Sequence, residues 1–199
     1  QAAARSQLSC ASYRSLTRTG ACAETRRMRR DEDSVMRRTV TRASVEFRGE
    51  QGVRLVADAW GDPQAAPVVL LHGGGQTRHA WGGTAAALAD AGWYAVSVDL
   101  RGHGDSEWSP DGDYSLQAFA GDLRAICDAL ARPTAVVGAS LGGLTALVAE
   151  GEGVCSLAAL VLVDCAPRLE SEGVDRIVEF MAGGMDGFAS LEEAADAIA

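Results

Sequence analysis

The residues of this chain best suited to chemistry are Gly-Ala-Ser-Leu-Gly at positions 138–142, with Ser140 at the centre. A serine hydroxyl attacks carbonyl carbon once a neighbouring base removes its proton. An apolar stretch precedes this motif and a helical pattern follows it, and the flanking glycines allow a strained strand-to-helix turn that exposes the hydroxyl. The spacing therefore predicts Ser140 as a catalytic nucleophile. The alternative is a glycine-rich turn whose serine caps the following helix.

A second glycine-rich segment, His-Gly-Gly-Gly at positions 72–75, directly follows the apolar residues 68–71. A glycine backbone lets such a loop turn tightly and approach a substrate carbonyl. The amides of Gly74 and Leu141 are then expected to form an oxyanion hole, which binds the negative oxygen of a tetrahedral intermediate. The sequence alone does not distinguish Gly74 from Gly75 as the donor.

These two motifs, with a third at residues 99–106 (Asp-Leu-Arg-Gly-His-Gly-Asp-Ser), resemble those of the α/β-hydrolase superfamily over residues 44–199. Residues 71–77 are similar to the branch of cofactor-free haloperoxidases, mixed with esterases and carbon–carbon bond hydrolases. The resemblance implies an α/β fold with a mostly parallel sheet, helices on both faces and a helical cap beginning at the C-terminus. It also implies a serine hydrolase acting on a small ester or related carbonyl, with perhydrolysis on the same machinery. No cofactor or metal site is expected.

The resemblance further implies a histidine that this sequence does not place where the family has it. The family's order along the chain is serine, acid, histidine, whereas His72, His79 and His103 all precede Ser140. We therefore expect the chain to be a fragment, inactive by itself, with the family's histidine beyond residue 199. His72 matches the family's motif histidine, which orients the oxyanion loop; ordinary loop hydrogen bonds are the alternative for His72 and His103.

Asp164, which closes the apolar stretch 157–163, is the candidate catalytic acid within the chain. Most of the family places the acid one strand later, and the alternative role of Asp164 is a helix cap or a loop hydrogen bond. Two rival functions fit the same motifs: a non-catalytic α/β-hydrolase fold that binds a ligand, and an acyltransferase. An Asp-bearing strand followed by a His-bearing loop in the continuation of the gene would favour an enzyme over a binding protein.

The elements that must position these residues alternate between strand and helix patterns. The predicted strands lie at residues 44–48, 53–60, 68–71, 93–98, 134–137 and 157–163. The predicted helices lie at residues 79–91, 114–131 and 141–150. The first two strands alternate around a turn and predict a hairpin, whereas later strands are apolar on both faces, as in a parallel sheet. Such a fold binds ligands at the carboxyl ends of its strands.

Charge is unevenly distributed along the chain. Residues 1–42 hold ten arginines against four acidic residues, a net charge of +6, whereas residues 43–199 hold eight against 23, a net charge of −15. An acidic body repels phosphate backbones, so we expect a small-molecule substrate and no nucleic acid partner. No apolar run reaches the length of a membrane span. We predict a soluble, cytoplasmic protein, and the sequence does not indicate its oligomeric state.

The five cysteines show neither CxxC spacing nor nearby histidines, which predicts reduced thiols rather than a zinc site or a disulfide framework. Residues 1–42 are rich in arginine and serine and are predicted to be a disordered leader. This leader is either a transit peptide or translated sequence upstream of a start at Met28 or Met36; the second is favoured because the chain begins at Gln1.

The remaining boundaries assign residues 43–167 to the α/β-hydrolase core and residues 168–199 to the start of a helical cap. Apolar residues recur at helical spacing in this last segment. In the family the cap covers the active site, so Phe180, Met181 and Phe188 are candidate substrate contacts. The alternative is that they pack against the body.

Overall fold

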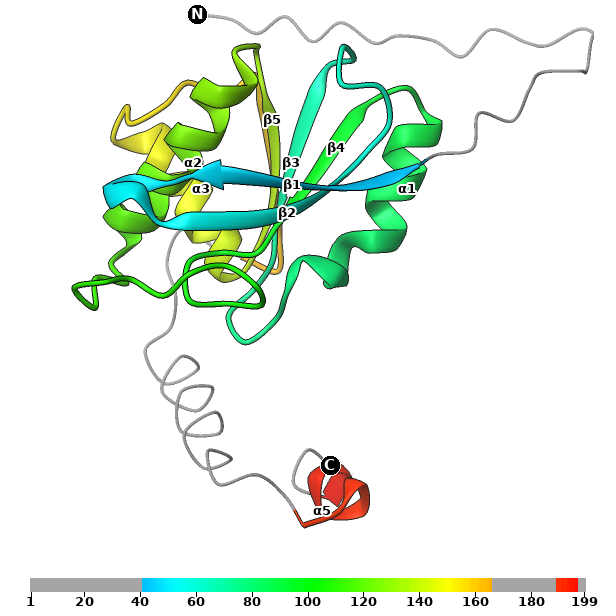
Figure 1. Ribbon diagram of the computed structural model, residues 1–199, viewed down its shortest axis with the longest axis vertical. Coiled ribbons are helices and arrows are strands. Elements are labelled where there is room, and N and C mark those ends of the chain that lie inside the picture. The colour runs from blue at the N-terminus through cyan, green and yellow to red at the C-terminus, as the bar shows by residue number, and fades with distance from the viewer. Residues whose placement is uncertain (1–40, 166–188, 197–199) are drawn as a thin grey trace, which may run out of the picture. The chain divides into compact units, whose positions relative to one another are not determined.

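The computed structural model describes residues 41–165 and 189–196, and its central element is a six-stranded sheet of order β1-β2-β4-β3-β5-β6 (Figure 1). The strands are β1 Arg42–Arg48, β2 Arg54–Trp60, β3 Pro67–Leu71, β4 Tyr94–Val98, β5 Ala135–Ala139 and β6 Ala159–Val163. The α-helices are α1 Gly82–Asp90, α2 Leu116–Leu130, α3 Leu141–Gly151 and α5 Leu191–Asp196. Two short 3-10 helices, η1 Glu50–Gly52 and η2 Arg78–Trp81, precede β2 and α1.

The opening hairpin is the antiparallel part of this sheet. β1 pairs with β2 from Arg42↔Trp60 to Arg48↔Arg54, and β2 pairs antiparallel with β4. The β3–β4, β3–β5 and β5–β6 pairs are all parallel. The predicted hairpin and the mostly parallel sheet are therefore confirmed.

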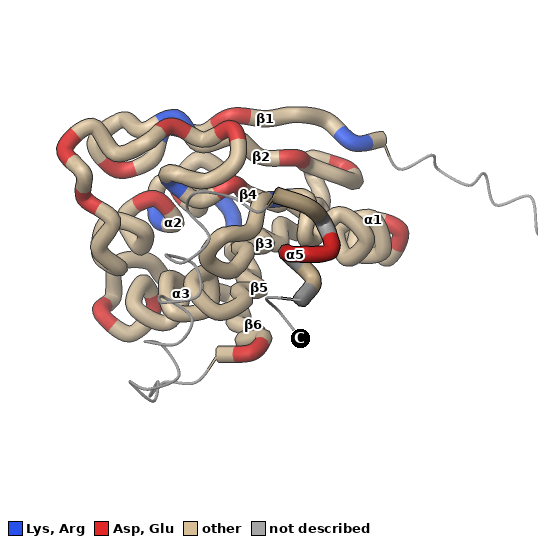
Figure 2. Tube along the Cα trace, turned by 90° about the horizontal axis from the view of Figure 1, so that it is seen from below, with Lys and Arg blue, Asp and Glu red and all other residues tan. Residues whose placement is uncertain are grey.

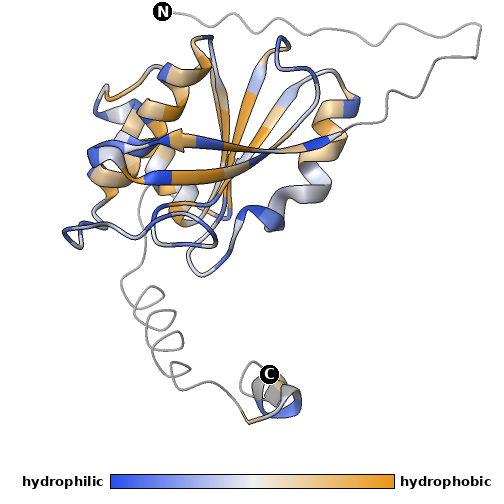
Figure 3. Cartoon of the chain, in the orientation of Figure 1, coloured by the Kyte–Doolittle hydropathy of each residue, from blue (hydrophilic) through white to orange (hydrophobic). Residues whose placement is uncertain are grey.

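Helices cover both faces of the sheet. Phe119, Leu123 and Ile126 of α2 pack with α3 residues into a buried cluster that includes Val69, Val96 and Val136 of the strands. On the opposite face Ala85 of α1 packs with Trp60, Val68 and Leu70. Hydrophobic residues accordingly concentrate along the central strands and on the helix surfaces that face them (Figure 3). The predicted α/β class, with helices on both faces, is confirmed.

β2 differs from its sequence pattern. Alternating residues predict one solvated face, but every residue from Leu55 to Trp60 is buried, including Asp58 at 1% exposure. The reason is the position of β2 between β1 and β4, with packing on both faces. The buried carboxylate of Asp58 is paired with Arg78 Nε at 3.1 Å and Arg42 Nη2 at 3.0 Å.

Helix α2, Leu116–Leu130, lies within the predicted helix 114–131. Its first turn is capped by Ser115 Oγ, which accepts a hydrogen bond from Ala118 N–H at 3.2 Å. It ends at Leu130, and the following residue, Ala131, has a φ of 52° in the left-handed region. Pro133 follows, and a proline cannot continue a helix. This helix therefore packs the apolar stripe of its amphipathic pattern against the sheet.

The predicted leader and cap fall largely outside the described residues. Residues 1–40, and the candidate contacts Phe180, Met181 and Phe188, are among those not described. β1 already begins at Arg42, the last residue assigned to the leader. In the described part of residues 168–199, Leu191–Asp196 form helix α5. Among the described residues, no helix is long and apolar enough to cross a membrane.

The described residues carry the acidic surface expected of residues 43–199. Aspartate and glutamate recur in the loops and at the helix ends, and basic residues are fewer (Figure 2).

Candidate active site

Ser140 occupies the turn between β5 and α3 in a strained conformation. Its φ and ψ are 44° and −111°, a region that L-residues rarely adopt. The turn is held by two backbone hydrogen bonds, from Ser140 N–H to Val163 O at 3.2 Å and from Leu144 N–H to Ser140 O at 2.9 Å. Ser140 is exposed, and its side chain makes no capping hydrogen bond to α3. The predicted strand-turn-helix geometry is therefore present, and the helix-capping alternative is wrong.

The glycines of the 138–142 motif are required by close backbone approach. A Cβ on Gly138 would lie 2.4 Å from Gly142 O, and a Cβ on Gly142 would lie 2.5 Å from Leu71 O. Real Cβ atoms do not come this close to backbone. The start of α3 thus packs directly on the ends of β5 and β3, which brings the turn at Ser140 beside the loop that follows β3.

The glycine-rich loop after β3 lies against Ser140. A Cβ on Gly73 would be 3.5 Å from Ser140 Cβ. Gly73 is buried, whereas Gly74 and Gly75 are exposed. The N–H of Gly73 donates to Gln76 Oε1 at 3.0 Å, and the N–H of Gly75 donates to His103 Nε2 at 3.4 Å. Within the described residues the amides of Gly74 and Leu141 donate to no partner. Of the two glycines that the sequence left open, Gly74 has the free amide.

His72 is a buried loop histidine with both ring nitrogens bonded to backbone. Leu100 N–H donates to Nε2 at 3.1 Å, so the ring proton is on Nδ1, which donates to Gly73 O at 2.8 Å. Burial lowers the pKa of His72, and the hydrogen bond to Gly73 opposes this effect. Gly142 N–H donates to the His72 carbonyl at 3.1 Å. His72 is therefore a neutral residue that joins the two loops and is not placed to act as a base.

The other two histidines do not reach the nucleophile either. His103 is half-buried and bonded to Gly75 N–H and to Arg101 O at 3.0 Å. His79 lies in η2 with its side chain 56% exposed, 3.7 Å from Asp58 Oδ2. In the described part of the chain, the hydroxyl of Ser140 has no histidine partner.

Asp164 lies at the carboxyl end of β6, one residue after Val163, whose carbonyl accepts the Ser140 N–H. It is exposed and has a positive φ of 48°. Its carboxylate makes no hydrogen bond or ion pair within the described residues. The neighbouring Cys165 is close to α3, where a Cβ on Gly143 would lie 3.0 Å from its Sγ. Asp164 thus lies near the Ser140 turn without a contact to it.

This geometry agrees with comparison to known proteins. A family model described as the alpha/beta hydrolase fold matches residues 66–197. The chain belongs to the α/β-hydrolase family. Ser140, the glycine-rich loop and Asp164 all fall within the matched region.

The relatives of this α/β hydrolase include named esterases. An esterase of Mycobacterium tuberculosis is 41% identical over 124 residues, which are 61% of this chain and 40% of the relative. Protein phosphatase methylesterase 1 of Mus musculus is 32% identical over 133 residues, which are 64% of this chain and 34% of the relative. A crystal structure of an α/β hydrolase from Novosphingobium aromaticivorans superposes with a TM-score of 0.62 at 29% identity, covering 69% of this chain and 49% of that one. The matches span less than half the length of each of these three proteins.

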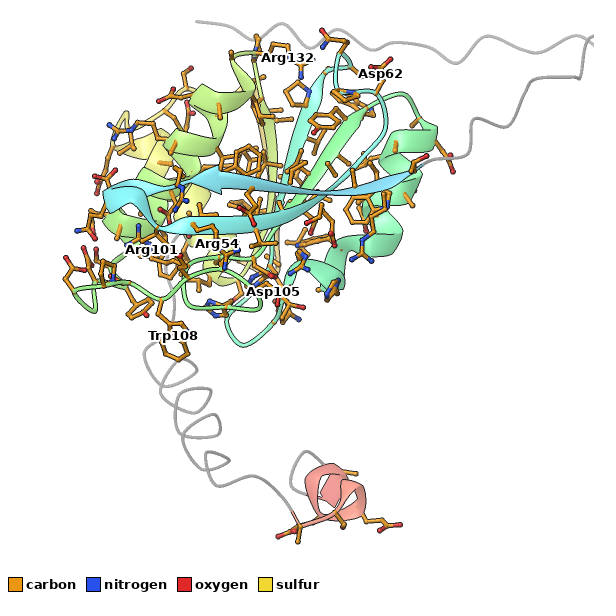
Figure 4. The ribbon with its side chains drawn as sticks, viewed as in Figure 1. Arg54, Asp62, Arg101, Asp105, Trp108 and Arg132 are labelled. Carbon is orange, nitrogen blue, oxygen red and sulfur yellow. The ribbon has the colours of Figure 1, made fainter. Side chains whose placement is uncertain are left out.

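The short helix η2, which follows the glycine-rich loop of this α/β hydrolase, carries Arg78 at the centre of an ionic network. This network was not predicted from the sequence. The Arg78 side chain is 8% exposed and pairs with Asp58, Asp99 and, at 2.7 Å, with Asp105. Figure 4 labels Asp105 on the loop 99–106. Burial lowers the pKa of Arg78, but the hydrogen bonds to Asp105 and Asp99 outweigh it and the net direction is upward. Asp99 also accepts Arg78 N–H at 2.6 Å and Asp105 N–H at 2.9 Å. Asp99 thereby joins the loops 72–78 and 99–106.

A second ionic pair fixes the loop 99–106 to helix α2. Arg101 is fully buried and donates through Nε and Nη2 to the two carboxylate oxygens of Asp122, both at 2.7 Å. Asp122 Oδ1 also accepts Glu50 N–H at 2.8 Å. Bidentate pairs of this kind set both position and orientation. The loop that carries His103 is therefore anchored to the core.

Proposed function

We propose that this α/β hydrolase is an esterase in which Ser140 forms an acyl-enzyme with a small carboxylic ester. Ser140 Oγ attacks the carbonyl carbon, and the carbonyl oxygen becomes an oxyanion that accepts hydrogen bonds from Gly74 and Leu141 amides. The bond to the alcohol oxygen then breaks, the alcohol leaves with the serine proton, and water releases the acid from Ser140.

The observation that carries this proposal is the exposed, strained Ser140 beside two amides that have no partner within the described residues. An oxyanion hole needs donors left free by the protein, because a donor that is already bonded must break that bond to serve. The names of the relatives, esterase and methylesterase, support the same class of reaction. Phe180, Met181 and Phe188 stay predicted substrate contacts, outside the described residues.

The general base for Ser140 is not among the three histidines of the chain. His72 and His103 are held in place by backbone partners, and His79 pairs with Asp58. The proposed turnover therefore requires an imidazole that none of these residues supplies. We propose that Asp164, exposed and next to the Ser140 turn, is the carboxylate that would orient such an imidazole.

The same placement of histidines favours a second candidate function, ligand binding without turnover. A protein of this kind would use the sheet edge at Ser140 for a carbonyl ligand and never form the acyl-enzyme. The two candidates differ in one measurable property, covalent capture of a substrate acyl group at Ser140.

Chemical rescue by added imidazole tests the proposal. The wild-type chain and Ser140→Ala are compared in the hydrolysis of p-nitrophenyl acetate, with and without imidazole, since the uncatalysed reaction with imidazole is equal in both. We expect negligible turnover without imidazole and a wild-type excess with it, together with fluorophosphonate labelling located at Ser140. Equal rates in the two proteins and no label on the wild type would refute the proposal and favour ligand binding.

The acyl acceptor distinguishes the finer alternatives. An acyl-enzyme passes its acyl group to water, to hydrogen peroxide or to an alcohol. Under rescue conditions, acceleration of p-nitrophenol release by peroxide identifies a perhydrolase, and acceleration by an alcohol with formation of the new ester identifies an acyltransferase. No acceleration by either identifies a hydrolase.

A further inference from the structure

The loops 72–78 and 99–106 share a hydrogen bond that assigns donor and acceptor roles to the ring nitrogens of a second histidine, His103. Gly75 N–H donates to His103 Nε2 at 3.4 Å, so this nitrogen carries no proton. The other nitrogen, Nδ1, lies 3.0 Å from the carbonyl oxygen of Arg101, which can only accept. The geometry therefore assigns the acceptor role to Nε2 and the donor role to Nδ1, as in His72.

The two imidazoles hold the glycine turn from opposite ends. His72 donates to Gly73 O, and His103 accepts from Gly75 N–H. Their ring centroids are 5.0 Å apart with an interplanar angle of 59°. Between these two contacts lies Gly74, whose amide is the one the turn leaves without a partner within the described residues. Gly74 N–H is thus flanked by two backbone groups, Gly73 O and Gly75 N–H, that are held by hydrogen bonds to the two histidines.

We propose that His103 is a positioning residue of the oxyanion hole. Its Nε2 accepts a hydrogen bond from the Gly75 amide. This bond holds the turn in the conformation in which Gly74 N–H faces the substrate oxygen. This inference rests on the proposed function of Ser140. His103 does not touch the reacting atoms, and acts through the backbone of the loop.

The position of His103 is itself fixed by the core. Its backbone N–H donates to Leu100 O at 2.9 Å, and its Nδ1 is bonded to the carbonyl of Arg101. The side chain of Arg101 is fully buried in the bidentate pair with Asp122. The glycine turn is thereby connected through His103 and Arg101 to helix α2. Rigid support of this kind is what a preformed oxyanion hole requires.

The chemistry of the contact selects the test variants. A glutamine side chain at this position would retain an acceptor oxygen near the place of Nε2, whereas a phenyl ring fills similar space without any acceptor. His103→Gln and His103→Phe are therefore a matched pair. Ordinary packing of the ring would be preserved better by His103→Phe, and the hydrogen bond better by His103→Gln.

Amide hydrogen exchange measured by NMR tests the contact without any activity. In the wild type we expect the Gly75 amide to exchange at least about ten times more slowly than the Gly74 amide, and nitrogen shifts to show His103 unprotonated at Nε2. His103→Phe should lose the protection of Gly75, and His103→Gln should retain it. A Gly75 amide as unprotected as Gly74 in the wild type would overturn the inference, whether or not the variants fold.

Imidazole-rescued ester hydrolysis tests the consequence for chemistry. We expect His103→Phe to lower kcat about 10-fold or more with KM nearly unchanged, because the oxyanion contact is made in the transition state. His103→Gln should recover most of this loss. Equal kcat in both variants and the wild type would refute the role of His103 while leaving Ser140 in place. Activity that persists in Ser140→Ala would instead refute the proposed function.

Discussion

Gly73 and Ser140 are close neighbours: a Cβ added to Gly73 would lie 3.5 Å from Ser140 Cβ and 3.7 Å from Ala139 O. The glycine-rich loop and the nucleophile turn therefore lie side by side, although they are separated by more than sixty positions in the sequence. Both also bond to His72, whose ring donates to Gly73 O and whose carbonyl accepts Gly142 N–H. The candidate site is assembled by the ends of β3 and β5, which pair in register from Val68↔Ala135 to Leu71↔Gly138.

Relief of backbone strain is the first prediction. Ser140→Gly is expected to raise the free energy of unfolding by about 1 kcal/mol relative to Ser140→Ala, because glycine adopts the positive φ of 44° without a Cβ clash. Urea denaturation measures the difference. Ala131→Gly, at a φ of 52° in the α2 terminus, is the control and should gain stability similarly without affecting fluorophosphonate labelling. A Ser140→Gly variant less stable than Ser140→Ala would show that the turn is unstrained.

The close approach of backbone atoms within the 138–142 turn gives the second prediction. Gly138→Ala places a Cβ 2.4 Å from Gly142 O and should cost about 3 kcal/mol or prevent folding, since the obstacle is backbone and cannot rotate away. Gly151→Ala is the matched control, because nothing lies within 4 Å of its Cβ position at the end of α3. That variant should be neutral or stabilised by about 0.5 kcal/mol. Thermal unfolding followed by circular dichroism distinguishes these outcomes.

The buried pair Arg101–Asp122 gives the third prediction. Arg101→Met leaves the Asp122 carboxylate buried without its cation and should cost about 3–5 kcal/mol. Burial already raises the pKa of Asp122 against the opposing effect of Arg101, so removal of Arg101 raises it further. A carboxyl whose folded pKa lies above its unfolded value destabilises the fold above that unfolded value, and the penalty disappears as the pH falls through the folded pKa.

The measurement for this pair is denaturation at two pH values. The cost of Arg101→Met relative to wild type should be smaller at about pH 5 than at about pH 8. The double variant Arg101→Met/Asp122→Leu removes the unpaired charge and should recover much of the loss at both. A cost that does not vary with pH would mean that Asp122 finds another partner.

Titration of His72 gives the fourth prediction. Burial lowers its pKa below the unfolded value of about 6.5. The folded protein therefore resists a proton that the unfolded chain binds, so this contribution to stability is present above about pH 6.5 and is lost as the pH falls toward the folded pKa. Denaturation at about pH 7.5 and about pH 5.5 should show a smaller pH-dependent loss in His72→Gln than in wild type. A loss of the same size in His72→Gln and wild type would contradict this role of His72.

The elements were largely predictable because their signals are local. Apolar runs mark β3 and β5, and the amphipathic pattern of residues 114–131 marks α2. The turn at Ser140 was also predictable, because a Cβ at either Gly138 or Gly142 would clash with backbone atoms and both positions therefore carry glycine. The full burial of β2 was not predictable, because it depends on the antiparallel β2–β4 contact and therefore on strand order.

The contacts that support the site could not be predicted from local pattern. Arg78 pairs with Asp58 and Asp99, each about twenty positions away in the chain, and no periodicity relates them. The bond between Gly75 and His103 likewise joins two loops that meet only after β3 and β4 align. Sequence reasoning left Gly74 and Gly75 undecided for this reason, since the deciding partner lies in the other loop.

The attachment of Gly142 to the end of β3 determines which parts of the site can be redesigned. Its N–H donates to His72 O at 3.1 Å, and a Cβ added to it would lie 2.5 Å from Leu71 O. Because these contacts join the first turn of α3 to the end of β3, a side chain added at Gly142 would displace the turn at Ser140 relative to the glycine-rich loop. Libraries aimed at bulkier esters would therefore do best to leave this junction untouched and diversify the more peripheral loops.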